Sequence, residues 1–224
     1  MRVLITGANR GIGLAMAKIY NDQGHEVIAV CRESNEEIEE YAAQVISGLD
    51  LTDDTAALQM QQVLNVSLGD NDALDVVINN AGLFNNESLG DIDLASVRAQ
   101  MEVNALAPLK VSEAVLPFLV PGSKIANITS RMGSIEDNTS GAYYGYRASK
   151  AALNAFTKSL AEDLKQHDIY ACVLHPGFVQ TRMVGFNGDL SPEQAAQGLI
   201  QRIEELNADN TGGFWHSNGT ALPW

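Results

Sequence analysis

The sequence predicts an α/β domain built on a parallel sheet with helices on both faces. Short β-branched runs alternate with helix-periodic stretches from the first residue to about residue 205. Most of these runs are continuously apolar, as strands covered on both faces should be. At 224 residues and 46% hydrophobic content, the chain is long enough to bury one sizeable core. We therefore expect residues 1–224 to form a single domain with a sheet of six to seven strands.

Each element has its own local signal. The predicted strands are 3–6, 27–31, 45–49, 74–79, 124–129 and 169–174, with a short seventh at 214–216. Apolar residues recur at helical spacing over 12–19, and again from Leu94 toward Leu116. A further helix opens at Ser191, an N-cap residue followed by Pro192 and the capping-box residue Gln194. Five glutamates between 33 and 40 are most simply one solvated helix face.

The charge balance excludes some classes of partner. The chain has 14 Lys and Arg against 28 Asp and Glu, a formal net charge of −14. Such a chain is not expected to bind nucleic acid or an anionic membrane through its bulk surface. A well-solvated surface explains the acidity, and a cationic substrate is the alternative.

Cysteine use and the absence of a targeting signal indicate the compartment. Cys31 and Cys172 lie in apolar runs and are expected to be reduced core residues. The apolar run at the N-terminus is too short for a signal peptide, and no stretch approaches about 18 uninterrupted apolar residues. We expect a soluble cytoplasmic protein.

A glycine-rich turn joins the first predicted strand to the first predicted helix. It reads Thr6-Gly7-Ala8-Asn9-Arg10-Gly11-Ile12-Gly13. Glycines let main-chain N–H groups approach a pyrophosphate, which the positive end of the helix then stabilises. The position of the turn in the first strand–helix–strand unit predicts a dinucleotide site in a doubly wound, Rossmann-type domain. The alternative is a tight turn without a ligand.

Further motifs follow the later strands. Asp50-Leu51 follows the third, Asn79-Asn80-Ala81-Gly82 ends the fourth, Ser130 follows the fifth, and Tyr146 and Lys150 form a Tyr-x-x-x-Lys pair. Together with the Thr-Gly-x-x-x-Gly-x-Gly spacing, these motifs resemble the short-chain dehydrogenase/reductase family over essentially the whole chain. The stretches 146–154, 174–177 and 222–224 resemble its branch of C-factor-like proteins and sniffer-type carbonyl reductases.

The resemblance implies a nicotinamide dinucleotide as cofactor and assigns residues to it. The implied cofactor-binding residues are Gly7, Asn9, Arg10, Gly11, Ile12, Gly13, Arg32, Asp50, Leu51, Asn80, Ala81, Gly82, Tyr146, Lys150, Pro176, Gly177, Val179 and Thr181.

The end of the second strand bears on the choice between NAD(H) and NADP(H). Counting about 20 residues from the last glycine points to Glu33, a carboxylate suited to the ribose hydroxyls of NAD. Cys31 is uncharged, however, and Arg32 suits the 2′-phosphate of NADP. Arg10 resembles a basic residue common in NADP-using members. We favour NADP(H), with Glu33 pointing outward.

Carbonyl reduction requires hydride at carbon and a proton at oxygen, and therefore a positioned general acid. Of the six tyrosines, only Tyr146 is followed four residues later by a lysine, which lies on the same helical face. Arg147 stands at that spacing from Tyr143, but an always-charged guanidinium is a poor proton relay. We predict Tyr146 as the acid/base, with Lys150 lowering the pKa of the phenol.

The resemblance implies two more catalytic residues. Ser130 would donate to the substrate oxygen; Ser134 is its rival, but only Ser130 directly follows a strand. Asn104 resembles the residue that anchors a water relay to Lys150, although a purely structural role also fits a buried helical Asn. His175 is interpreted as structural, because no cluster with metal-ligand spacing accompanies it and no metal is expected.

Two functional hypotheses remain. The first is an NADP(H)-dependent carbonyl reductase or alcohol dehydrogenase with Asn104, Ser130, Tyr146 and Lys150 as its catalytic residues. The second is a non-catalytic nucleotide-binding sensor or C-factor-like signalling protein on the same fold. The short segment 182–190 suggests an open site tolerant of different small substrates. Family resemblance implies a homodimer or homotetramer through the helices containing Asn104 and Tyr146, and a monomer is the alternative.

Overall fold

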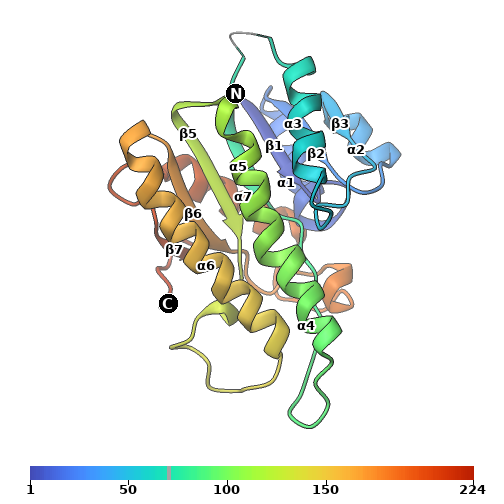
Figure 1. The fold of residues 1–224 in the computed structure, drawn as a ribbon, viewed down its shortest axis with the longest axis vertical. Helices are drawn as coiled ribbons and strands as arrows, with labels where there is room; N and C mark the ends of the chain where they lie inside the picture. The colour runs from blue at the N-terminus through green and yellow to red at the C-terminus, as the bar shows by residue number, and fades with distance from the viewer. Residues whose placement is uncertain (70–71) are drawn as a thin grey trace.

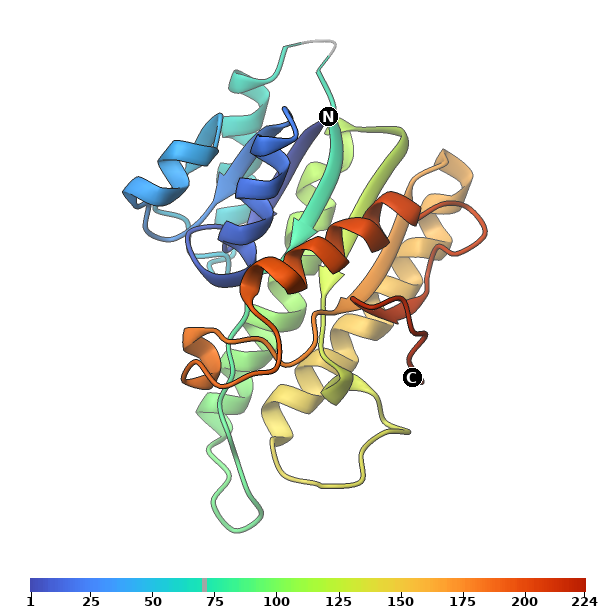
Figure 2. The ribbon, with the colours of Figure 1, turned by 180° about the vertical axis from the view of Figure 1, so that it is seen from behind.

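The computed structural model describes residues 1–69 and 72–224 and contains a seven-stranded, all-parallel sheet (Figures 1 and 2). The strands are β1 (Arg2–Thr6), β2 (Glu26–Val30), β3 (Gln44–Ile46), β4 (Leu74–Asn79), β5 (Leu119–Ile128), β6 (Tyr170–His175) and β7 (Phe214–His216). Their order is β3-β2-β1-β4-β5-β6-β7. The strand order reverses between β1 and β4, and ligands of open α/β sheets bind at the carboxyl ends of strands on either side of such a point.

Helices cover both faces of the sheet (Figures 1 and 2). The α-helices are α1 (Gly11–Asp22), α2 (Glu36–Tyr41), α3 (Ala56–Ser67), α4 (Leu94–Met101), α5 (Ala107–Val115), α6 (Tyr144–Leu164) and α7 (Pro192–Glu205). Shorter turns are η1 (Glu102–Leu106), η2 (Leu116–Phe118), η3 (Arg131–Gly133), η4 (Lys165–His167) and η5 (Arg182–Val184). Helices α1, α2 and α7 contribute to one buried cluster, and α3, α5 and α6 to the other. The predicted fold class is confirmed.

Alternation along the strands builds these two cores. Val3 and Ile5 belong to the cluster beneath α1 and α7, whereas Leu4 between them belongs to the opposite cluster. Successive side chains of a strand point to opposite faces, so a continuously apolar strand fills both layers. Cys31 and Cys172 are both buried and unpaired, as predicted.

Three predicted elements are corrected. The fifth strand, predicted at 124–129, runs from Leu119 to Ile128, and Leu119 already pairs with Leu74 of β4. The third strand, predicted at 45–49, ends at Ile46, because Gly48 adopts a left-handed conformation (φ 80°) and its N–H donates to Arg32 O at 3.0 Å. The helix predicted from Leu94 toward Leu116 is interrupted by the π-helical turn η1. By contrast, the capping box at Ser191 and Gln194 is present as predicted.

The described residues contain no helix that is both long and apolar enough to span a bilayer. Loops at the carboxyl ends of the strands extend well beyond the sheet, most visibly the segments before α4 and before α6 (Figure 1). The candidate site lies at this end.

Candidate active site

The glycine turn is packed tightly against the neighbouring strand ends. Gly7 donates its N–H to Val30 O at 2.8 Å, and a Cβ on Gly7 would lie 2.9 Å from Ala81 Cα. A Cβ on Gly13 would lie 2.3 Å from Gly7 O and 2.6 Å from Asn80 Nδ2. Glycine is therefore required at both positions by direct contact with other parts of the site.

The first turn of α1 is available to an anion. Its N-cap residue, Arg10, makes no side-chain cap to the helix, and the intrahelical bonds begin with Leu14 N–H to Arg10 O at 3.3 Å. The N–H groups of a first turn have no partners within the helix, and the helix dipole adds positive potential there. This cradle fits a dinucleotide pyrophosphate, which main-chain N–H groups of Gly11, Ile12 and Gly13 would hold.

Asn80 links β4 to the glycine turn. Its side chain donates to the main-chain oxygens of Thr6 and Gly7, both at 3.1 Å, and the Thr6 hydroxyl accepts from the N–H groups of Asn80 and Ala81. The Asn80-Ala81-Gly82 motif and the glycine turn therefore form one unit.

The residues predicted to select the cofactor lie around the end of β2. Arg10, Arg32 and Glu33 are exposed. Asn9 donates its side-chain amide to Glu33 O at 2.9 Å, which ties the glycine turn to this segment. Asp50 accepts from Thr52 through Oδ1, and these bonds, followed by the positive charge of Arg32, lower the pKa of its carboxyl. Leu51 is half-buried next to it.

The segment after β6 closes the other side of the glycine turn. Val179 is buried and forms a bridge with Leu190, and Thr181 donates its N–H to Val179 O at 2.8 Å. A Cβ on Gly11 would contact Thr181 Cγ2 at 3.4 Å. Pro176 and Gly177, the latter with φ 94°, lead the chain from β6 into this segment. All the predicted cofactor-binding segments thus meet at the carboxyl ends of the strands.

Tyr146, Ser130 and Lys150 come together beyond β5. The Ser130 side chain lies close enough to the Tyr146 phenol to lower its pKa, and the Ser130 hydroxyl accepts from Met132 N–H at 3.1 Å. The Lys150 Nζ donates to Ile128 O at 2.8 Å and lies 5.9 Å from the centroid of the Tyr146 ring. Helix α6 places Tyr146 and Lys150 on one face, as the spacing predicted.

The ionisation of Tyr146 and Lys150 in the protein without cofactor differs from the prediction. Removal from water raises the pKa of Tyr146 to about 12, and the nearby Ser130 side chain only partly offsets the rise. Burial likewise lowers the pKa of Lys150 to about 7, so its charge near neutral pH is incomplete. In the free protein Lys150 therefore does not bring the phenol pKa below its usual value, and the phenol is a protonated donor.

Asn104 occupies the π-helical turn η1 and is fully buried. Its Oδ1 accepts from Leu83 N–H at 2.7 Å, and its Nδ2 donates to Leu83 O at 2.8 Å and to Ser149 Oγ at 3.0 Å. Single π-turns inside helices occur frequently at functional sites. Asn104 thus joins the segment after Gly82 to α6, one residue before Lys150.

Ser134 and His175, which the sequence analysis set aside as site residues, have other partners in the structure. Ser134 donates to Trp224 O at 3.0 Å and accepts from Asp137 N–H. His175 packs edge-on against His216, with ring centroids 4.9 Å apart, and burial lowers its pKa to about 3. The described residues contain no group of His, Cys, Asp and Glu suited to a metal ion.

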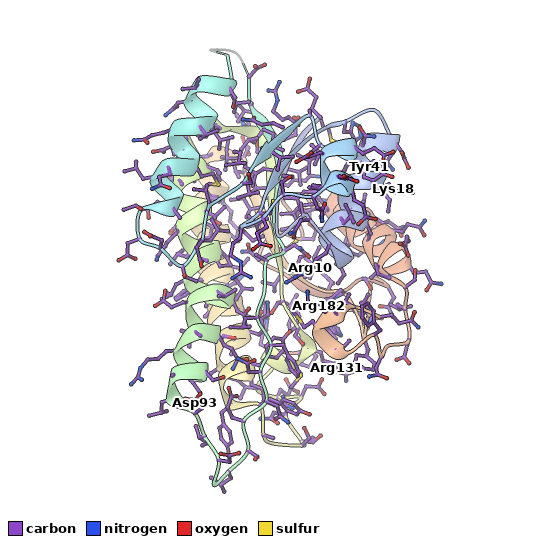
Figure 3. All side chains as sticks on the ribbon, turned by 90° about the vertical axis from the view of Figure 1, so that its right-hand side faces the viewer. Arg10, Lys18, Tyr41, Asp93, Arg131 and Arg182 are labelled. Carbon is purple, nitrogen blue, oxygen red and sulfur yellow. The ribbon has the colours of Figure 1, made fainter. Side chains whose placement is uncertain are left out.

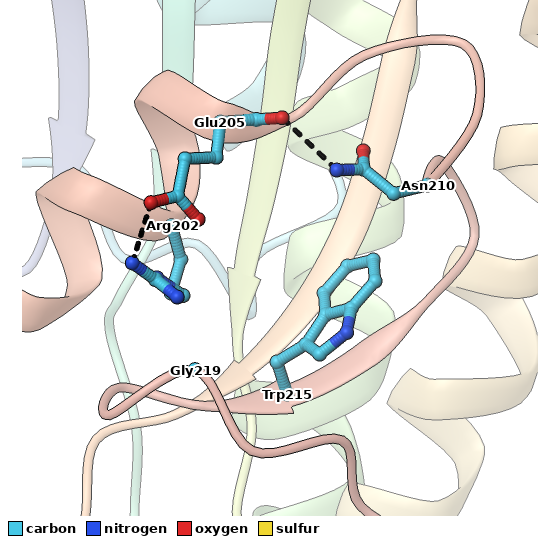
Figure 4. A pocket seen from close by; sticks show the side chains of 5 residues that line it. All are labelled: Arg202, Glu205, Asn210, Trp215 and Gly219. Carbon is cyan, nitrogen blue, oxygen red and sulfur yellow. Dashed lines mark hydrogen bonds and ion pairs between the residues drawn. The ribbon is translucent and has the colours of Figure 1, made fainter.

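Basic side chains gather at this edge despite the acidic composition. Figure 3 shows Arg10, Arg182 and Arg131 following one another along one side of the molecule. Arg131 pairs with Asp137, whereas Arg182 lies exposed on η5. A separate cavity of about 120 Å³ lies between the end of α7 and the segment after β7 (Figure 4), and none of its lining residues is a predicted site residue.

Sequence reasoning missed Glu87, a buried carboxylate that binds the first turn of α6. It also missed Trp224, whose main-chain oxygen accepts from Ile135 N–H at 2.6 Å. Glu87 lies in no motif, and the stretch 222–224 that contains Trp224 was singled out only as a mark of the family branch, with no structural role. Both residues act across long sequence separations.

Comparison with known proteins gives consistent matches. The family model of short chain dehydrogenases matches residues 1–191. A 1-hydroxy-2-glutathionyl-2-methyl-3-butene dehydrogenase of Rhodococcus sp. (strain AD45) is 37% identical in an alignment of 227 positions that covers 99% of this chain and 99% of that protein. The C-signal protein of Myxococcus xanthus is 42% identical in an alignment of 154 positions that covers 67% of this chain and 93% of that protein.

Solved structures are similar over the full length. The carbonyl reductase Sniffer of D. melanogaster has a TM-score of 0.89 and 30% sequence identity, covering 100% of this chain and 99% of that chain. An NADPH-bound carbonyl reductase from chicken fatty liver has a TM-score of 0.86 and 28% identity, covering 100% of this chain and 98% of that chain.

Proposed function

This chain belongs to the short-chain dehydrogenase/reductase family, and we propose that it transfers hydride between NADP(H) and a small carbonyl or alcohol substrate. The resemblance predicted from its motifs, including the branch of C-signal and sniffer-type proteins, is confirmed. One observation carries the proposal: Tyr146, Ser130 and Lys150 meet at the carboxyl end of β5, the same edge of the parallel sheet that carries the cradle at α1.

The proposed mechanism assigns one task to each side chain. The nicotinamide supplies the hydride that reaches the carbonyl carbon. Tyr146 donates the phenolic proton to the carbonyl oxygen, and its raised pKa keeps that proton in place until the oxygen becomes basic. Ser130, whose side chain lies beside the phenol, donates to the same oxygen and orients it. In the oxidative direction, Tyr146 accepts the proton of the alcohol.

Lys150 and Asn104 support this transfer. The incompletely charged Lys150 gains charge beside an anionic cofactor, and its ammonium then favours the phenolate that forms as Tyr146 gives up its proton. Asn104 fixes the segment after Gly82 against α6 through Leu83 and Ser149. We assign it the water relay to Lys150 implied by the family.

The preference for NADP(H) rests on charge. Arg32 stands exposed at the end of β2, and Arg10 is exposed in the glycine turn. Two guanidinium groups suit the 2′-phosphate of NADP. Glu33 is exposed and is tied through its main-chain oxygen to Asn9, in keeping with an outward carboxylate. A carbonyl reductase of similar fold with bound NADPH supports the same preference.

The substrate is proposed to carry an apolar group close to its carbonyl or alcohol. Phe178, Met183 and Phe186 are each 45% exposed or more on the segment between β6 and α7, and Phe84 packs edge-on against Tyr146 with centroids 4.9 Å apart. The Rhodococcus relative is named for an alcohol with a glutathionyl group. A glutathione-conjugated alcohol therefore belongs in the substrate panel.

We also propose a homodimer through α4, α5 and α6. Leu94, Leu109 and Leu116 on and after these helices are exposed, at 59%, 38% and 40%. Light scattering tests the assembly.

The similarity to C-signal favours a second candidate, a signalling protein that binds the nucleotide without turnover. The two candidates differ in whether Tyr146 is needed for a reaction.

The test is a panel of carbonyls with NADPH and NADH, and of alcohols with the oxidised cofactors, followed by nicotinamide absorbance. We expect turnover with NADPH that Tyr146→Phe lowers by about 100-fold or more, the usual contribution of a general acid. NADPH affinity should remain within about twofold, because the ring and its packing are kept. Tight NADPH binding without turnover on any substrate would instead support the signalling candidate.

A further inference from the structure

Glu87 is a charged side chain in an unusual position. It lies in the segment between β4 and α4 and is only 2% exposed. Carboxylates are almost never fully buried unless they are paired or hydrogen-bonded, because desolvation disfavours the charged form. Its partners therefore indicate why it is there.

Those partners come from two helices. On the α4 side, Glu87 Oε1 accepts from Ser96 Oγ and from Gln100 Nε2, both at 2.6 Å. On the α6 side, Oε2 accepts from Gly145 N–H at 3.0 Å, and the main-chain oxygen accepts from Tyr143 N–H at 2.7 Å. Glu87 joins α4 to the first turn of α6.

The start of α6 depends on this support. Gly141, Ala142 and Tyr143 all have positive φ, at 67°, 53° and 53°, and two of them carry side chains that disfavour this conformation. The N-cap residue Tyr143 makes no side-chain cap. Glu87 supplies the missing acceptor from another segment, and a carboxylate is favourable beside a helix N-terminus.

The same segment also packs against the phenol. Phe84, three residues before Glu87, contacts the Tyr146 ring edge-on at 4.9 Å and the Tyr143 ring at 5.7 Å. Gln100 holds the chain between Phe84 and Glu87, because Gln100 Oε1 accepts from Asn85 N–H at 2.9 Å.

We infer that Glu87 is a positioning residue for Tyr146, which it holds through Gly145 and through the Phe84 segment. The inference rests on the proposed function. Tyr146 directly follows the residue that Glu87 binds, so a shift of the first turn of α6 moves the phenol relative to Ser130. Gly145 permits the approach, since a Cβ there would lie 2.5 Å from Gln100 Nε2 and 3.2 Å from Glu87 Oε1.

The first variant is Glu87→Gln, which keeps the size of the side chain. The NH2 group introduced at position 87 must face a hydrogen-bond donor, either Gly145 N–H or the side-chain NH2 group of Gln100. If the Gln100 amide rotates to present its oxygen to position 87, the NH2 group of Gln100 then faces Asn85 N–H. We expect kcat to fall by about tenfold or more, since small misplacements of reacting groups are costly. The Kd for NADPH should stay within about twofold, because Glu87 makes no bond to the glycine turn or to residues 79–82.

The rescue variant is Glu87→Gln with Gln100→Glu. In it the amide introduced at position 87 donates to the carboxylate introduced at position 100, and its oxygen accepts from Gly145 N–H. The introduced carboxylate still accepts from Asn85 N–H. We expect kcat to return to within about threefold of wild type. Glu40→Gln is the matched control: Glu40 is exposed on α2, and its change should leave kcat unaltered.

Amide hydrogen exchange of residues 143–147 tests the support without relying on turnover. Exchange should be faster in Glu87→Gln and should return to the wild-type rate in the double variant. Unchanged exchange, or a kcat of Glu87→Gln within twofold of wild type, would overturn the inference. So would a double variant that binds NADPH normally but is not rescued. If the wild type turns over no substrate, the proposed function fails while the exchange result still decides whether Glu87 holds α6.

Discussion

The cofactor side and the substrate side of the site are held together by different kinds of contact. The cofactor side comprises residues 6–13 and 79–82, where main-chain atoms, a hydroxyl and one amide meet at close range. The substrate side comprises residues 84–93, 131–143 and 182–190, of which the first two segments depend on single side chains and on the last residues of the chain. The first is specified by local sequence, and the second by long-range contacts.

Conformational strain and exposure follow the same division. On the substrate side, Ala142, Tyr143 and Phe186 adopt positive φ without being glycine. Leu89, Ile135 and Phe186 are large apolar residues left 70% exposed or more. On the cofactor side, the positive-φ residues Gly7 and Gly11 are glycines. The substrate side, with its strained backbone and exposed apolar groups, can differ in sequence between proteins with different substrates. The cofactor side must fit one ligand.

The largest effect is expected from Gly13→Ala on the cofactor side. The new Cβ would lie 2.3 Å from Gly7 O, a contact with main chain that cannot be relieved by a side-chain rotation. Overpacking of this kind costs about 1–3 kcal/mol, and we expect NADPH affinity to fall by about 100-fold as the cradle opens. Fluorescence titration with NADPH measures the loss.

Gly90→Ala is the matched control for this prediction. Gly90 lies on the substrate side, and a Cβ there would meet nothing within 4 Å. Its φ of 96° makes the substitution strained, yet NADPH affinity should stay within about twofold. Equal losses of NADPH affinity in Gly13→Ala and Gly90→Ala would contradict the distinction between the cofactor side and the substrate side.

A smaller effect is expected from Arg32→Asp, which changes ligand choice without changing the fold of the cofactor side. Arg32 is exposed, so the substitution should leave stability almost unaltered. Loss of a charge-assisted bond to the 2′-phosphate, together with new repulsion, should lower the NADPH-to-NADH affinity ratio by about 10- to 100-fold. The two dissociation constants are measured by titration. Arg98→Asp, also exposed, is the control; a ratio that moves equally in both variants would exclude a specific role for Arg32.

The division also explains how much could be predicted from the sequence. The strands, the glycine turn, the capping box at Ser191 and the pairing of Tyr146 with Lys150 follow from periodicity, from glycine stereochemistry and from helical spacing. All of these signals depend on residues that are close together in the sequence. The π-turn around Asn104 and the early end of β3 were missed because they depend on how the chain meets its neighbours.

The site residues missed by sequence reasoning act over longer distances. Glu87 reaches Gly145, 58 residues away, and Ser134 reaches Trp224, 90 residues away. In the protein without cofactor the phenol pKa is raised, which spacing did not predict, because spacing places Lys150 near Tyr146 but does not show how strongly both are desolvated.

The smallest effect is expected where the end of the chain supports the substrate side. Trp224 O accepts from Ile135 N–H at 2.6 Å, from Ser134 Oγ at 3.0 Å and from Glu136 N–H at 3.3 Å, and the Trp224 ring packs on Phe214 with centroids 5.4 Å apart. These bonds hold the segment that connects Ser130 to Tyr146. Deleting residues 222–224 should therefore raise the substrate KM by about three- to tenfold while NADPH affinity stays within about twofold.

Steady-state kinetics on the best substrate, with NADPH titration beside it, separates the two effects of this deletion. Trp224→Ala keeps the main-chain acceptor and loses only the ring, so its KM should lie between those of the wild type and the deletion. Leu58→Ala, a similarly exposed apolar residue on α3, controls for loss of surface apolar area and should change neither constant. A deletion that weakens NADPH binding as much as it raises KM would mean that the two sides are not independent. A deletion that changes KM alone would show that substrate recognition can be altered from the end of the chain without disturbing the cofactor side.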